Sequence, residues 1–384
     1  MKTRSVSPAI TTFALVIFLL LRPELLDALQ QEGEQTQTSA QQEEGNIFEE
    51  DPFGGNPNPP IPSEPDEADD EDEPMTGDPQ LPGGPRANRP NESDQGQGGE
   101  EEEWVPPEAE VVTLDTSDRV ILQADYYAGK PGKTTAPVIL LHDFDGSRED
   151  MRFLALHLQS LGHAVIAPDI RGHGASTMVQ GIDDPIDRSR FRAVEIMSIK
   201  VDIERCKKYL MTRNNAGELN IELLTVVSVG CSAIPAVNWC VDDWFLYPAF
   251  VNGRKQGQDV KAIAMIGPIR RFKSAALTQT IRSPLFTGDD LERPLAVQLA
   301  WASDDGEQAR EGEAIQSSLE RSRRRLEKKY MKTIRPYETG MSATELVAGA
   351  EHEVIFQDVA DFIEMAVLRR ADSLPWQNRA RPDE

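Results

Sequence analysis

Apolar positions from Val111 onward follow two alternating periods. Short apolar runs, typical of strands, are separated by longer segments in which apolar residues recur at helical spacing. The first two runs alternate with polar residues, as an antiparallel edge does, and the later ones are continuously apolar, as parallel strands covered on both faces are. The expected strands are Val111–Leu114, Arg119–Tyr126, Val138–Leu141, Ala164–Pro168, Leu223–Ser228, Ala262–Ile266, Leu295–Trp301 and Thr333–Tyr337. The expected helices span residues 148–161, 189–213, 233–241, 306–331 and 352–370.

Eight strands with helices between them predict one α/β domain over residues 111–370, followed by a C-terminal tail over residues 371–384. Residues 136–176 hold a strand, a helix and a strand, which indicates a right-handed crossover onto a parallel sheet. Fewer than 30 residues, 267–294, separate the sixth and seventh expected strands. This gap is too short for a large lid, so we expect a small lid or none.

Residues 1–29 have the pattern of a signal peptide. Lys2 and Arg4 precede an apolar run of 12 residues from Ile10 to Leu21. Such a run is too short to span a bilayer as a helix and suits the apolar core of an export signal. We therefore expect a secreted or periplasmic protein with no transmembrane segment in the mature chain. An uncleaved, short membrane anchor is the alternative.

Residues 30–110 form an acidic segment that differs from the rest of the chain. It contains 24 Asp and Glu residues against two Arg, and 13 of the 27 prolines. Sparse apolar residues cannot offset the entropy lost on folding, so we expect disorder. The segment carries about −22 of the net charge of −25, which leaves residues 111–384 at about −4. The acidity therefore describes a linker rather than the folded domain.

Composition and spacing exclude several classes of site. The three cysteines, Cys206, Cys231 and Cys240, are odd in number and scattered, so we expect buried thiols and no disulfide framework. No spacing typical of zinc ligands or of a phosphate-binding loop occurs, so we expect no metal and no cofactor. The basic run over residues 321–329 is interleaved with Glu and indicates a solvated helix face, so no nucleic-acid partner is expected.

Two loops that follow expected strands carry unusual residues. His142-Asp143-Phe144-Asp145-Gly146 follows one strand, and Asp169-Ile170-Arg171-Gly172-His173-Gly174-Ala175-Ser176 follows the next. The pair resembles the α/β-hydrolase fold family, close to its lysophospholipase and serine-aminopeptidase-like branch. That family has a His-Gly loop after one strand and Asp-x-Arg-Gly-His-Gly-x-Ser after the next. The resemblance covers about residues 110–370 and implies an eight-stranded, mostly parallel sheet flanked by helices.

The resemblance also implies a catalytic site. A nucleophile elbow, Gly-x-Ser-x-Gly, follows the fifth strand of such a domain, where this chain has Gly230-Cys231-Ser232-Ala233-Ile234. The family pattern would make Ser232 the nucleophile, Asp305 the acid and His352 the base. The backbone N–H groups of Phe144 and Ala233 would form the oxyanion hole.

Three departures from the family pattern lie where the chemistry would occur. Asp143 replaces the glycine of the first loop, Ile234 replaces the second glycine of the elbow, and residues 338–344 hold no histidine. A helix cap is the alternative role for Ser232 and Asp305, and a surface position is the alternative for His352.

The sequence therefore predicts two functions. The first is a serine hydrolase that cleaves an ester or amide bond of a small-molecule substrate through an acyl-enzyme on Ser232. The second is a catalytically degenerate, non-catalytic member of the fold that binds a ligand or a partner outside the cell or in the periplasm. A third, weaker alternative makes the acidic segment the functional part and the domain its anchor.

Overall fold

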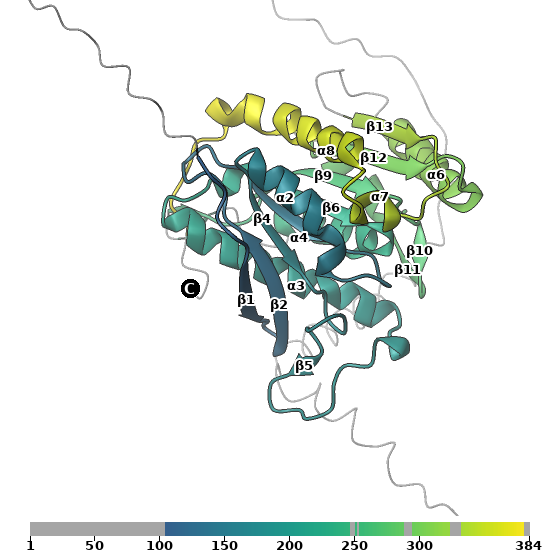
Figure 1. Cartoon of the computed structure of the whole chain (residues 1–384), viewed down its shortest axis with the longest axis horizontal. Coiled ribbons are helices and arrows are strands. Elements are labelled where there is room, and N and C mark those ends of the chain that lie inside the picture. Colours follow the sequence, from purple (N-terminus) through teal and green to yellow (C-terminus); the bar gives the residue numbers. More distant parts are fainter. Residues whose placement is uncertain (1–103, 246–249, 252, 288–293, 323–331, 380–384) are drawn as a thin grey trace, which may run out of the picture. The chain divides into compact units, whose positions relative to one another are not determined.

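The eight expected strands pair into one sheet in the order β1-β2-β4-β3-β6-β9-β12-β13 (Figure 1). β1 and β2 run antiparallel to their neighbours, and the ladders from β4 to β13 are parallel. The predicted antiparallel edge and parallel centre are thus confirmed. The strands are β1 Glu110–Asp115, β2 Val120–Tyr127, β3 Pro137–Leu141, β4 Ala164–Pro168, β6 Leu224–Val229, β9 Val260–Ile266, β12 Ala296–Ala302 and β13 Lys332–Tyr337. The short strand β5 (Met178–Val179) pairs with β2.

The structure, a computed structural model, describes residues 104–245, 250–251, 253–287, 294–322 and 332–379. The predicted signal peptide over residues 1–29 and nearly all of the acidic segment over residues 30–110 lie outside the described residues. None of the described helices combines the length and the hydrophobicity that a membrane span requires.

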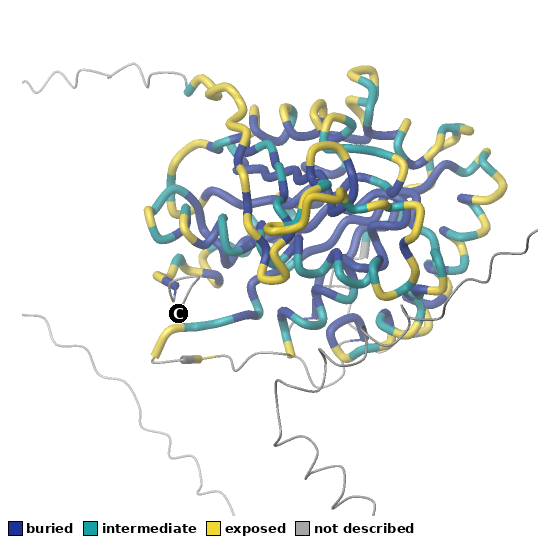
Figure 2. Tube along the Cα trace, turned by 90° about the horizontal axis from the view of Figure 1, so that it is seen from below, coloured by how far each residue is buried: buried dark blue, intermediate teal, exposed yellow. Residues whose placement is uncertain are grey.

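Helices cover both faces of the sheet. Alternate residues of β3 point to opposite faces, so Ile139 and Leu141 enter one apolar core and Val138 and Leu140 the other. The first core includes side chains of α3, α4 and α6, and the second those of α2 and α8. The central strands β3, β4, β6, β9 and β12 are accordingly buried almost throughout, in the centre of the domain (Figure 2). The helices are α2 Arg152–Ser160, α3 Ala193–Asn215, α4 Ala233–Phe245, α6 Gly306–Ser322 and α8 Glu353–Ala366.

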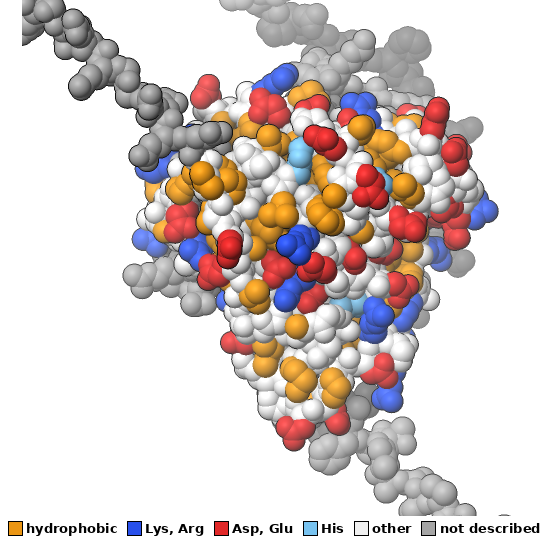
Figure 3. Space-filling view, viewed as in Figure 1, with side chains coloured by type: hydrophobic (Ala, Val, Ile, Leu, Met, Phe, Trp, Pro, Cys, Tyr) orange, Lys and Arg blue, Asp and Glu red, His pale blue; other side chains and the backbone are white. Residues whose placement is uncertain are grey.

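The expected helices are found with shifted ends. The second expected helix, over residues 189–213, begins with a 3-10 turn at Arg188–Arg190, and α3 starts only at Ala193. The last expected helix divides into α8 and a 3-10 segment at Leu368–Ser373. The end of the helix expected over residues 306–331 lies outside the described residues. Charged side chains of both signs are mixed over the face shown in Figure 3, as the small net charge of residues 111–384 predicts.

The motif Asp169–Ser176 holds the framework together rather than facing a ligand. Arg171 is buried and makes ion pairs with Asp202 of α3 and with Asp118. Asp169 accepts hydrogen bonds from the backbone N–H groups of Arg148 and Ala175, both at 2.9 Å. Buried carboxylates and guanidinium groups are tolerated when they are paired in this way. The motif therefore joins the loops after β3 and β4 to α3.

The predicted C-terminal tail over residues 371–384 contacts the domain as far as Arg379. The indole N–H of Trp376 donates to the backbone oxygen of Asn214 (3.1 Å). Arg379 is fully buried and donates to the carboxylates of Glu222 (2.6 Å) and Asp259. Only residues 380–384 of this segment lie outside the described residues.

Candidate functional site

The turn between β6 and α4 is the place where the resemblance to α/β-hydrolases would put a nucleophile. It consists of a 3-10 turn, Gly230–Ser232, directly followed by α4. Gly230 is the residue of this turn in the left-handed backbone region, with φ of 57°. The nucleophile of such an elbow sits on this strained strand-to-helix turn. Gly230, and not Ser232, has this backbone conformation, and the small residues Ser228 and Ser232 lie two positions away on each side.

Two backbone N–H groups at this turn donate to one side-chain carboxylate of the chain itself. One carboxylate oxygen of Asp143, Oδ1, accepts hydrogen bonds from the backbone N–H groups of Cys231 (2.8 Å) and Phe144 (2.7 Å). An oxyanion hole of this fold uses the N–H after the nucleophile and one from the loop after the third strand. Cys231 and Phe144 hold those two places. Asp143 supplies the negative oxygen that a reacting substrate would otherwise bring.

The resemblance implies the N–H groups of Phe144 and Ala233 as oxyanion donors. The N–H of Phe144 donates to Asp143, as does that of Cys231. The N–H of Ala233 instead bonds back to the carbonyl oxygens of Gly230 and Cys231 within the 3-10 turn. The physical reason is the register of the elbow: its strained residue lies two positions before Ser232, so the free donor is the N–H of Cys231.

Asp143 also fills the space above the elbow. A Cβ atom placed on Gly230 would lie 2.2 Å from Cγ of Asp143 and 2.3 Å from both carboxylate oxygens. Among the described residues, neither Arg148 nor Arg171 forms an ion pair with Asp143. Arg148 pairs with Asp125 and Asp169, and Arg171 pairs with Asp118 and Asp202. A side chain at position 230 and the carboxylate of Asp143 therefore cannot share this site without movement.

Ser232 performs the structural role of a cap. Its side chain is fully buried, and Oγ donates to the backbone oxygen of Val229 (2.8 Å), with that of Leu141 at 3.2 Å. Oγ also accepts the N–H of Val229 (3.1 Å). These contacts join the ends of β3 and β6. The hydroxyl is directed into the backbone and away from any substrate.

Asp305 and His352 contact residues other than those of the turn between β6 and α4. Asp305 caps α6, because its carboxylate accepts the N–H groups of Glu307 (2.9 Å) and Gln308 (3.2 Å). Hydrogen bonds from Gln308 and Glu307 lower the pKa of Asp305. His352 precedes α8, with Nε2 3.8 Å from a carboxylate oxygen of Glu351. Within the described residues, no hydrogen bond or ion pair joins any two of Ser232, Asp305 and His352.

The thiol beside the elbow offers no replacement nucleophile. Cys231 is buried, and burial together with the neighbouring Asp143 carboxylate raises the pKa of its thiol. A thiol acts as a nucleophile in its thiolate form, which these surroundings disfavour. All three cysteines are free and buried, as the sequence predicts.

A short hairpin covers the loop that carries the oxyanion donor. Its strands are β10 (Arg271–Phe272) and β11 (Ala275–Ala276). The ring of Phe272 lies 4.8 Å from that of Phe144 between centroids, and Nζ of Lys273 lies 4.5 Å above the Phe144 ring. Lys273 also donates to the backbone oxygen of Arg188 (3.1 Å). The hairpin lies within residues 267–294, the segment for which the sequence predicts a small lid or none.

The turn of this hairpin is strained. Lys273 and Ser274 have φ of 45° and 71°, as the two central residues of a type I′ hairpin turn require. Side chains other than glycine cost about 1–2 kcal/mol each in this backbone region. Contacts of Lys273 and Phe272 with Phe144 hold the turn in place and offset this cost.

The chain matches no known sequence family and no curated protein sequence. Solved structures with a similar fold include a dienelactone hydrolase from Anabaena variabilis, which is 15% identical with a TM-score of 0.47 over 68% of this chain and 99% of that one. The esterase Pf2001 of Pyrococcus furiosus is 15% identical, with a TM-score of 0.45 over 67% and 92% of the two chains. Esterase 2 of Thermogutta terrifontis, solved in a form phosphorylated by paraoxon, is 14% identical, with a TM-score of 0.46 over 67% and 94%.

The order and direction of the strands, with helices on both faces of the sheet, confirm the expected eight-stranded, mostly parallel α/β sheet. The closer assignment to the lysophospholipase and serine-aminopeptidase-like branch stays a prediction.

Proposed function

We propose that this protein is a non-catalytic member of the α/β-hydrolase fold and that it acts by binding a ligand or a partner. One observation carries the proposal: the carboxylate of Asp143 accepts both oxyanion-hole N–H groups directly above Gly230. Acyl transfer needs a nucleophile at the elbow and empty donors that meet the developing negative charge. Glycine supplies no nucleophile, and the donors already hold a carboxylate.

Energetics favour the filled state of the hole. One oxyanion donor contributes about 3 kcal/mol to catalysis when it is free. A substrate oxygen entering the hole would have to displace the Asp143 carboxylate and leave that charge close to its own. The negative charges of the Asp143 carboxylate and of the substrate oxygen would repel each other at the reduced dielectric of a protein interior. The same two hydrogen bonds that stabilise the fold therefore oppose the reaction.

A fluorophosphonate probe tests the proposal on the full chain. We expect no covalent labelling of the folded protein, because no serine hydroxyl is both exposed at the elbow and next to a base. The Ser232→Ala variant serves as the matched control and should behave as the unmodified chain does. A covalent adduct mapped to Ser232 by mass spectrometry, absent in the variant, would refute the proposal and restore the hydrolase alternative.

We also propose that the protein is exported through residues 1–29, on the pattern of Lys2, Arg4 and the apolar run that follows. Expression in a secreting host followed by N-terminal sequencing tests this. A mature N-terminus near Ala28 supports export, and an intact Met1 in a membrane fraction supports the anchor alternative.

A further inference from the structure

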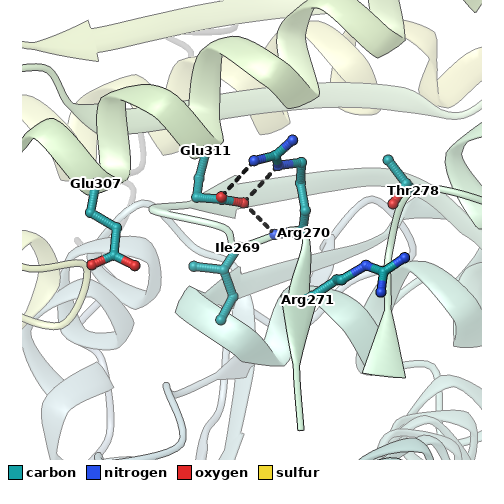
Figure 4. A pocket seen from close by; sticks show the side chains of 6 residues that line it. All are labelled: Ile269, Arg270, Arg271, Thr278, Glu307 and Glu311. Atoms are coloured by element: carbon teal, nitrogen blue, oxygen red, sulfur yellow. Dashed lines mark hydrogen bonds and ion pairs between the residues drawn. The ribbon is translucent and has the colours of Figure 1, made fainter. Parts of the chain in front are cut away.

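A pocket opens at the edge of the sheet where its parallel strands end. Its volume is about 430 Å³, and it lies between the segment that follows β9 and the first turns of α6 (Figure 4). Ligands of open α/β sheets bind outside the carboxyl ends of the strands, which is where this pocket lies. The residues that line it are Ile269, Arg270, Arg271, Thr278, Glu307 and Glu311.

Arg270 and Glu311 neutralise each other and form a fixed wall. Nε and Nη2 of Arg270 donate to the two carboxylate oxygens of Glu311, at 2.9 and 2.8 Å. The backbone N–H of Arg270 donates to the same carboxylate at 2.8 Å. The hydrogen bonds from Arg270 lower the pKa of Glu311. A bidentate pair with a third hydrogen bond is geometrically rigid, so neither charge is available to a ligand.

The pocket has two further charges, and these are unpaired. Arg271 is exposed on β10, and Glu307 is exposed on the first turn of α6. Across the ranges that the structure describes, neither side chain takes part in a hydrogen bond or an ion pair. Glu307 lies on one side of the Arg270–Glu311 pair, and Arg271 and Thr278 lie on the other (Figure 4).

We propose that this pocket binds a short peptide with free termini, its amine at Glu307 and its carboxylate at Arg271 and Thr278. A guanidinium group and a hydroxyl are suited to a carboxylate, and a carboxylate is suited to an ammonium group. In a single α-amino acid the amine and the carboxylate are attached to the same carbon, whereas Glu307 and Arg271 lie on opposite sides of the Arg270–Glu311 pair (Figure 4). The peptide groups between the termini would lie along that pair and Ile269. This proposal rests on the ligand-binding part of the proposed function and deepens it.

Calorimetric titration of the full chain with three tripeptides tests the proposal. The probes are triglycine, N-acetyl-triglycine, which lacks the terminal amine, and triglycine amide, which lacks the terminal carboxylate. We expect triglycine to bind and each blocked form to bind about tenfold more weakly, as the loss of one charge-assisted hydrogen bond predicts. Equal binding of the three peptides, or no binding of triglycine at millimolar concentration, overturns the proposal.

Variants assign each terminus to its side chain. Glu307→Gln should abolish the preference for triglycine over its N-acetyl form, and Arg271→Gln the preference over its amide. Both side chains are exposed, so neither change should unfold the domain. Arg310→Gln and Glu313→Gln, on exposed positions of α6 outside the pocket, are matched controls and should keep both preferences. Loss of discrimination in the controls as well would show that the effect is not local to the pocket.

The outcome is independent of the fluorophosphonate experiment. Covalent labelling of Ser232 would refute the non-catalytic proposal and leave the peptide titrations unchanged. Absence of peptide discrimination would refute the pocket assignment and leave the filled oxyanion hole in place.

Discussion

Gly230 and Asp143 are predicted to be strongly coupled in stability. Alanine at position 230 introduces a Cβ atom 2.2 Å from Cγ of Asp143, in a backbone with φ of 57°. The left-handed backbone costs about 1–2 kcal/mol for a residue with a Cβ atom. Overlap in a packed site costs about 1–3 kcal/mol more. We therefore expect Gly230→Ala to lower the free energy of unfolding by about 2–5 kcal/mol.

Removal of the carboxylate has its own cost. In Asp143→Ala, the N–H groups of Cys231 and Phe144 lose their acceptor. A buried donor without a partner costs about 1–3 kcal/mol. In the double variant the overlap disappears with the carboxylate, while the backbone strain remains. The loss for the double variant should therefore be smaller than the sum of the two single losses by about 1–3 kcal/mol.

Guanidinium-induced unfolding followed by tryptophan fluorescence measures this double-mutant cycle. Gly217→Ala is the matched control for backbone strain, because Gly217 has φ of 80° and an added Cβ would meet nothing within 4 Å. It should lose only about 1–2 kcal/mol. Losses that add to within about 0.5 kcal/mol, as those of independent sites do, would refute the assignment of Asp143 to the space above Gly230.

Three further outcomes follow from the buried polar groups. Ser232→Ala should lower the free energy of unfolding by about 1–2 kcal/mol in the same assay, because the buried N–H and backbone oxygen of Val229 lose a partner. No measurable loss would contradict the structural role of the Ser232 hydroxyl. Arg379→Met should cost about 3 kcal/mol or more by leaving the buried carboxylates of Glu222 and Asp259 less compensated, whereas the exposed control Arg369→Met should change stability by under about 0.5 kcal/mol. Burial lowers the pKa of His142 to about 4, below its ordinary value of 6.5. The unfolded chain therefore binds the proton more readily than the folded one. We expect the contribution of His142 to the free energy of unfolding to be fully present above pH 6.5 and to fall as the pH is lowered toward 4. Unfolding titrations between pH 6.5 and 4 should show a shallower decline of the free energy of unfolding in His142→Gln than in the unmodified chain. An unchanged decline would contradict the role of His142 in this pH dependence.

Much of the fold could be predicted because its signals are local. Continuous apolar runs and helical spacing depend on neighbours in the sequence, and all eight expected strands are present in the sheet. The motif from Asp169 to Ser176 is also local in sequence, and Asp169 and Arg171 bind fixed partners in the framework. Helix ends were less certain, since caps and 3-10 turns such as Arg188–Arg190 shift them by a few residues.

The site was harder to predict, because its register depends on backbone conformation. The serine-centred match placed the elbow on Ser232, whereas the left-handed residue of the turn is Gly230. The sequence contains one signal for this register. In Ser228-Val229-Gly230-Cys231-Ser232, small residues stand two positions before and after Gly230, whereas the pattern centred on Ser232 has Ile234 in place of its second glycine. Asp143 was recognised as a departure from the family pattern, but its role was not.

The sequence by itself determined the order of strands and helices, the acidic segment and the position of the two signature loops, since each is written in adjacent residues. Only the tertiary structure decided what those loops do. Asp143 lies 88 positions before Cys231, and the parallel pairing of β3 with β6 brings the two together. A hydrogen bond between residues so far apart in the sequence depends on the register of β3 against β6 and on the positive φ of Gly230. Neither can be read from the residues that flank Asp143 or Cys231.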